Sequence, residues 1–82
     1  MGHYSTKKGK VWDKGQTIRG KDSNLYRKDS EGNVMYKHSY GKASSMGWEI
    51  DHSKPVSKGG TDHLNNLKPM NTSANRSKGN KY

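Results

Sequence analysis

The sequence predicts a small α+β protein. Two short runs with large side chains flank a cluster of turn-forming residues, a period-two run follows, and a polar segment with helix-capping residues lies near the end. The chain has 82 residues, of which 26% are hydrophobic, and it contains no Phe. Such a chain buries only a small core, so we expect other interactions to help stabilise the fold.

The N-terminal stretch 1–23 is rich in Gly, Lys and Ser. Its large residues, Tyr4, Val11, Trp12 and Ile18, follow neither a helical nor a strand period. We therefore predict a flexible basic segment over residues 1–23, with at most a turn or two of structure and a mobile stretch over the first eight or so residues. The folded domain is expected to span residues 24–82.

A β-hairpin is predicted next, with strands at residues 25–28 and 34–37. The intervening Asp-Ser-Glu-Gly-Asn is suited to a hairpin loop, and Tyr26 and Tyr36 would face each other across the strands. Aromatic and basic side chains on a hairpin can stack on nucleic acid. Because the chain is so poor in hydrophobic residues, we instead favour the core for four aromatic residues: Tyr26, Tyr36, Tyr40 and Trp48.

Two more strands and a helix complete the prediction. Within residues 47–52, Trp48 and Ile50 would lie on one face and Glu49 and Asp51 on the other, the pattern of a half-buried strand. A loop with Pro55, Gly59 and Gly60 follows, and then a strand at residues 67–70 and a helix at residues 74–78. The candidate caps of this helix are Asn71, Thr72 or Ser73 at its start and Gly79 at its end.

Charge is the strongest signal in the composition. The chain has 16 Lys and Arg against 7 Asp and Glu, a net charge of +9. A positive field of this size attracts polyanions, most often nucleic acid, although structural ribosomal proteins and toxins are equally basic. No Cys is present, so disulfides and thiolate zinc sites are excluded. No run approaches the roughly 18 apolar residues of a membrane span and no secretory signal is visible, so we expect a soluble, cytoplasmic or phage-encoded protein without a membrane partner.

Asp51 and His52 stand side by side at the end of the third predicted strand. In a regular strand they would point to opposite faces, so for both to serve one site the backbone must depart from the pleat there. Pro55, close behind, favours such a departure. Our hypothesis is that Asp51 holds a divalent cation and His52 takes a proton from water, although such pairs also occur by chance.

The segment GWEIDHSKPVSKGGTDHLNNLKPMNTSANRSKG resembles the motif of the HNH endonuclease family. An acid–histidine pair, a basic loop ending in two glycines, an Asn-Leu step and a terminal Asn occur in the family's order. The run YRKDSEGNVMYKHSYGKASSMGWEID is also similar to the upstream segment of one HNH subgroup. The resemblance implies a ββα-metal (His-Me finger) fold with its motif core at residues 47–79 and, here, an additional N-terminal β-hairpin.

The resemblance also implies roles for individual residues. Asp51 would be a metal ligand and His52 the general base. Asn66, with Asn65 as an alternative register, would orient the base by hydrogen-bonding the loop backbone. Asn75 would be the second metal ligand, where the founding pattern has His, so this chain would be a His-Asn-Asn variant.

The chemistry of these residue types agrees with the implied roles. An imidazole has an ordinary pKa near 6.5 and can accept a proton at neutral pH. One carboxylate and one amide oxygen leave most positions of an octahedral ion to water and phosphate oxygens, which suits Mg²⁺ or Mn²⁺ better than Zn²⁺.

Several neighbours carry weaker expectations. Four basic side chains are candidates for contacts with phosphates, or are simply solvated: Lys54, Lys58, Arg76 and Lys78. We expect Glu49 to face solvent, and we assign no role to Asp62 and His63.

We therefore expect a metal-dependent endonuclease that nicks DNA with low sequence specificity, RNA not being excluded. One alternative is a nuclease toxin domain countered by an immunity protein, and another is a nucleic-acid-binding module that has lost turnover. A protein partner, either a larger assembly or an immunity protein, is compatible with the small size.

Overall fold

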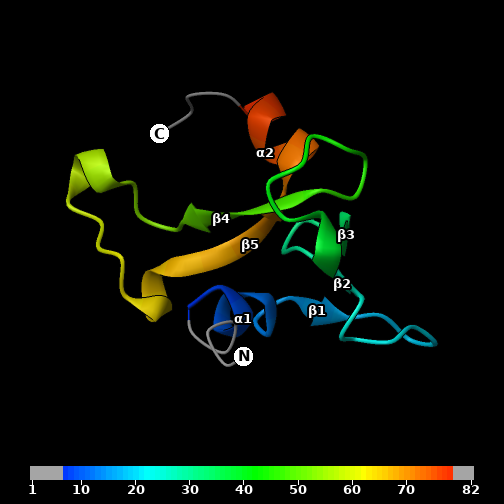
Figure 1. Cartoon of the computed structure of the whole chain (residues 1–82). Helices are drawn as coiled ribbons and strands as arrows, with labels where there is room; N and C mark the ends of the chain where they lie inside the picture. Colours follow the sequence, from blue (N-terminus) through cyan, green and yellow to red (C-terminus); the bar gives the residue numbers. More distant parts are fainter. Residues whose placement is uncertain (1–6, 79–82) are drawn as a thin grey trace.

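The computed structural model describes residues 7–78 of the chain, and these form two α-helices and five β-strands in two small sheets (Figure 1). The elements are, in chain order, α1 (Lys7–Trp12), β1 (Gln16–Thr17), β2 (Tyr26–Lys28), β3 (Val34–Tyr36), β4 (Trp48–His52), β5 (Leu67–Asn71) and α2 (Thr72–Lys78). This order confirms the predicted α+β class. The helix exit predicted at Gly79 and the first six residues of the predicted mobile stretch lie outside the described residues.

The first sheet has the strand order β1-β2-β3, with both pairs antiparallel. The hairpin of β2 and β3 confirms the prediction, because Tyr26 lies opposite Tyr36 with the ring centroids 5.2 Å apart. The turn between them includes Gly32, whose φ of +86° is a conformation that glycine adopts without strain.

The second sheet is the antiparallel pair of β4 and β5, in which Trp48 lies opposite Asn71 and His52 opposite Leu67. This pairing is regular through His52, and Ser53 extends it by donating its N–H to the carbonyl oxygen of Asn66 at 2.8 Å. The predicted departure from the pleat at Asp51 and His52 is therefore wrong, because continuous hydrogen bonding to β5 holds the strand straight until its end.

The helix α2 follows β5 without a loop. The side-chain oxygen of Asn71 accepts the N–H of Ala74 at 3.1 Å, so Asn71 is the N-cap among the three predicted candidates. Its amide nitrogen donates to the carbonyl oxygens of Val34 and Ser45, both at 2.9 Å. The start of α2 is thus tied to β3 and to the loop before β4.

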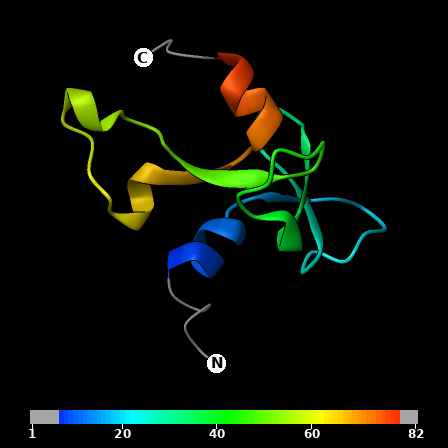
Figure 2. The same ribbon diagram turned by 45° about the horizontal axis from the view of Figure 1, so that its top comes forward.

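The two helices lie on opposite sides of the β4–β5 pair, α1 on one and α2 on the other, as both ribbon views show (Figures 1 and 2). Trp48 of β4 packs on Trp12 of α1, with the ring centroids 5.0 Å apart. The buried hydrophobic residues all belong to this region or to β3: Val11, Trp12, Met35, Trp48, Leu67 and Met70. The hydrophobic core therefore sits mainly between α1 and the sheet.

This core changes two expectations. Val11 and Trp12 are fully buried, so the segment from Lys7 onward packs with the rest of the chain and the boundary expected at residue 23 does not separate two structural units. A helix of six residues with only two buried positions is too short to show a period in the sequence. Of the aromatic residues assigned to the core, Trp48 is buried, Tyr26 and Tyr36 are half-buried, and Tyr40 is 40% exposed, so the prediction is wrong for Tyr40.

A buried carboxylate supplements the small core. Asp29, only 1% exposed, accepts the backbone N–H groups of Glu31 and Asn33 at 2.9 Å and that of Asn71 at 3.0 Å. Charged hydrogen bonds of this kind are stronger than neutral ones. Asp29 therefore joins the hairpin turn to the residue that caps α2.

Among the described residues, no helix is long and apolar enough to span a bilayer.

Candidate active site

Glu49 lies on the side of β4 that faces α2. The side-chain nitrogen of Asn75 donates to its Oε2 at 2.8 Å, and Nη2 of Arg76 is 3.9 Å from its Oε1. The Glu49 side chain is 26% exposed, so the expectation that it faces solvent is wrong. Because α2 packs across this face, an acidic residue that the strand pattern placed outward lies beneath a helix. The signal for it was present in the sequence, since Glu49 and Asp51 are two residues apart and share one face of the strand.

Asp51 shares this face because β4 is regular, and it lies opposite Lys68 of β5. Two carboxylates thus lie on the strand face toward α2, and the Asn75 amide of that helix contacts one of them, Glu49. All three are oxygen donors of the type that hard divalent cations prefer. Residues 7–78 contain no cluster of three or more His, Cys, Asp and Glu residues that could hold a metal ion. A cation here would therefore have few protein ligands and would complete its coordination with water and phosphate oxygens.

His52 is the last residue of β4, and alternation along the strand sends its side chain to the other face from Asp51. Its Nε2 is 2.7 Å from Oδ1 of Asp62, in the loop between β4 and β5. This hydrogen bond is the main reason why the pKa of the Asp62 carboxyl lies below its ordinary value of 3.8, and the charge of His52 lowers it further. A carboxylate partner on Nε2 favours the tautomer whose Nδ1 accepts a proton. The sequence assigned Asp62 no role, and only the path of the loop brings it to His52.

Asn66 organises that loop. Its side-chain oxygen accepts the N–H of Lys54 at 2.8 Å, and its nitrogen donates to the carbonyl oxygens of Lys54 at 3.1 Å and Thr61 at 2.7 Å. Gly60 closes the loop tightly, because a Cβ there would lie 1.8 Å from the Lys54 carbonyl oxygen. These contacts stabilise the loop that begins directly after His52 in the sequence. The neighbouring Asn65, the alternative register, is exposed.

The basic residues expected near phosphates lie in two places, the loop after His52 and the helix α2. Lys54 and Lys58 are exposed in the loop after His52, and Arg76 is exposed on α2 beside Glu49. Lys78 ends α2, and its side chain lies outside the described part of the chain.

The predicted site residues thus fall into two groups, one on the face of β4 toward α2 and one at the His52–Leu67 end of the β4–β5 pair. Asp51 and Asn75 share the α2 face, together with Glu49. His52 and Asn66 lie at the base of the loop, together with Asp62. Neither Glu49 nor Asp62 was predicted as part of the site.

Two antiparallel strands followed at once by a helix, with an acid–histidine pair at the end of the first strand, define the ββα class of small α+β domains. A family model described as HNH endonuclease matches residues 37–81, more than half of the 82-residue chain. The chain belongs to the HNH endonuclease family. Comparisons with curated proteins and with solved structures find no match.

Proposed function

We propose that this protein is a metal-dependent endonuclease that hydrolyses phosphodiester bonds in DNA, nicking with low sequence specificity. The observation that carries the proposal is the 2.7 Å hydrogen bond between Nε2 of His52 and Asp62, at the end of the strand that also carries Asp51. It supports a general base whose ring is already oriented before substrate binds.

The proton acceptor is Nδ1 of His52. With Nε2 donating to Asp62, Nδ1 takes a proton from the attacking water, and the Asp62 carboxylate stabilises the resulting imidazolium. Asn66 keeps the loop that carries Asp62 closed behind the histidine through its bonds to Lys54 and Thr61. General base catalysis of this type contributes roughly 10²- to 10⁴-fold.

Asp51 and Asn75 are the proposed ligands of the divalent cation. Because Asp51 and His52 point to opposite faces of β4, the substrate phosphate would have to bridge the end of the strand to contact both the ion and the base. Their oxygen donors fit Mg²⁺ or Mn²⁺, and Glu49 fixes the Asn75 amide by accepting its N–H at 2.8 Å. With the nitrogen engaged in this way, Asn75 presents its amide oxygen to the ion. The bound cation would supply positive charge to the phosphate as charge builds up on its oxygens.

Charge and helix length support DNA as a substrate that is cut with little sequence preference. A net charge of +9 favours the phosphate backbone, which carries no sequence information. Reading bases in the major groove usually takes an inserted helix or ribbon. The longest helix among the described residues is α2, with 7 residues, and it is engaged with β4.

The test is a nicking assay on supercoiled plasmid in Mg²⁺, in Mn²⁺ and in EDTA. We expect relaxed circles with either metal and none in EDTA. His52→Ala should reduce nicking at least 100-fold, whereas the matched control His63→Ala, an exposed histidine in the same loop, should leave it within about twofold. Activity that survives His52→Ala would refute the assignment of the base. Plasmid that is bound but uncut in every metal would favour the nucleic-acid-binding module instead.

A further inference from the structure

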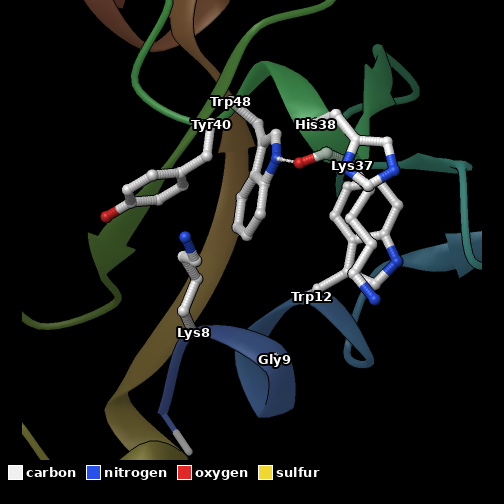
Figure 3. A pocket seen from close by; sticks show the side chains of 7 residues that line it. All are labelled: Lys8, Gly9, Trp12, Lys37, His38, Tyr40 and Trp48. Carbon is white, nitrogen blue, oxygen red and sulfur yellow. Dashed lines mark hydrogen bonds between the residues drawn. The ribbon is translucent and has the colours of Figure 1, made fainter. Parts of the chain in front are cut away.

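We propose that a second nucleic-acid contact lies on the α1 side of the protein, where a cavity binds one nucleotide of a single strand. The cavity has a volume of about 400 Å³, within the range of small-molecule sites. It opens between α1 and the 3₁₀ turn Lys37–Ser39 (Figure 3). Its walls include Lys8, Trp12, Lys37, His38, Tyr40 and Trp48.

None of the residues assigned to the candidate active site is among the described residues that line the cavity. Trp48 lines it and packs on Trp12 of α1, whereas the next residue, Glu49, bonds to Asn75 of α2 on the other face of β4. Lys8 and Trp12 also lie outside the residues 37–81 that match the family. The contact is therefore built partly by the segment that precedes the matched region.

The rings are held in place before any ligand arrives. Nε1 of Trp48 donates to the carbonyl oxygen of Lys37 at 3.0 Å, which fixes the indole against the 3₁₀ turn (Figure 3). Tyr40 packs on Trp48 in an edge-to-face arrangement, with the centroids 4.9 Å apart, and yet remains 40% exposed. A rigid, partly exposed aromatic ring is the feature on which bases of single-stranded nucleic acid stack. Trp12 and Trp48 are buried and form the floor rather than the stacking surface.

The charge around the cavity selects an anionic aromatic ligand. Two lysines and a histidine line it, and no acidic residue of the described stretch 7–78 does so. The Lys8 ammonium lies 4.6 Å from the centre of the Tyr40 ring, a cation–π contact, so a base stacks on this face of the ring only if the lysine moves aside toward the ligand's phosphate. A nucleotide would place its base against Tyr40 and its phosphate near Lys8 and Lys37.

The test measures binding of a fluorescein-labelled ten-nucleotide oligo(dT), and of an abasic oligonucleotide of the same length, by fluorescence anisotropy in EDTA. Two matched pairs separate stacking from general charge. Tyr40→Ala removes the ring whereas Tyr40→Phe keeps it, and Lys8→Ala is paired with Lys10→Ala, since Lys10 is exposed on the same helix but does not line the cavity.

We expect Tyr40→Ala to weaken oligo(dT) binding about tenfold and Tyr40→Phe by no more than about twofold. Lys8→Ala should weaken it several times more than Lys10→Ala. The abasic strand should bind the parent protein more weakly and should be insensitive to Tyr40→Ala. Equal effects within each pair, or equal affinity for the two oligonucleotides, would overturn the proposal. The comparison of Lys8→Ala with Lys10→Ala stays informative if Tyr40→Ala fails to fold. Because the binding assay needs no cleavage, its outcome is independent of the nicking experiment.

Discussion

The side chain of Asn75 reaches from α2 to Glu49 on β4 with a hydrogen bond of 2.8 Å. It is a short link between the helix and the strand that carry the two proposed metal ligands, Asn75 and Asp51. Because the amide nitrogen is the donor, the orientation of the whole amide depends on the Glu49 carboxylate.

Glu49→Ala should lower the nicking rate in Mg²⁺ by about 10- to 100-fold, the usual cost of removing a residue that orients a metal ligand. Glu49→Gln should lower it less, because its side-chain oxygen still accepts the Asn75 N–H. Initial rates at several Mg²⁺ concentrations provide the measurement, with circular dichroism to confirm the fold. Nicking by Glu49→Ala at the parent rate would show that Asn75 needs no such support.

The Asp62 carboxyl should titrate below its ordinary pKa of 3.8, chiefly because of its hydrogen bond to His52. Because the pKa of Asp62 is lower in the folded than in the unfolded protein, its bond with His52 stabilises the fold at pH values above the unfolded-state pKa. This contribution is lost as the pH falls through the lowered folded-state pKa. NMR titration of the side-chain carboxyl carbon measures the pKa directly. In His52→Ala it should return toward 3.8, whereas His63→Ala, which removes a smaller charge effect, should move it less.

Asn66→Ala should destabilise the protein by about 1–2 kcal/mol, since three hydrogen bonds to the loop backbone are lost at a partly exposed site. Asn66→Asp should cost at least as much, because an acceptor would then face the carbonyl oxygens of Lys54 and Thr61. Urea unfolding gives the free energy. The exposed neighbour Asn65→Ala is the control and should stay within about 0.5 kcal/mol of the parent.

Asp29→Ala should be among the most damaging single changes, at about 3 kcal/mol or more. It leaves the N–H groups of Glu31, Asn33 and Asn71 without their acceptor, and that of Asn71 is buried. Asp22→Ala is the matched control, because Asp22 is exposed and accepts the N–H of Asn24. It should cost less than about 1 kcal/mol. Similar urea midpoints for the two variants would contradict the structural role of Asp29.

Deletion of residues 1–23 should abolish cooperative unfolding. It removes Val11 and Trp12 from the core and takes away Lys14, which donates to the carbonyl oxygens of Leu64 and Leu67 just before and within β5. Truncating one buried Trp alone costs about 3–5 kcal/mol, a large part of the stability of a small domain. A sigmoidal thermal transition of the shortened chain, followed by circular dichroism, would show that residues 24–82 fold without the segment.

Strands β2 to β5 and the second helix were predictable because their signals are local, whereas the two-residue strand β1 lies in the stretch predicted to be a flexible segment. The turn cluster after β2, the alternation in β4 and the capping Asn71 each depend on a few adjacent residues. The role of α1 was not predictable, since two buried residues in a single short helix form no pattern. The exposure of Tyr40 was missed for a related reason. The low content of hydrophobic residues indicates that aromatic side chains must contribute to the core, but it does not indicate which of them are buried.

For the candidate site, the sequence indicated the residues on β4 and α2 but not their partners. Glu49 and Asn75 are 26 positions apart and His52 and Asp62 are 10 apart, so each contact depends on how a helix or a loop folds back. The assumption that Asp51 and His52 must leave the pleat together also failed, because pairing with β5 outweighs the preference of the loop that follows.

The contact between Trp12 and Trp48 has a practical consequence. They are the only 2 tryptophans of the chain, they lie 5.0 Å apart, and they come from different elements, α1 and β4. Intrinsic fluorescence and the coupled near-ultraviolet signal of the two indoles therefore report whether α1 is docked on the sheet, without any added label. A stopped-flow refolding experiment can time that docking separately from formation of the β2–β3 hairpin, whose aromatic residues are tyrosines and not tryptophans.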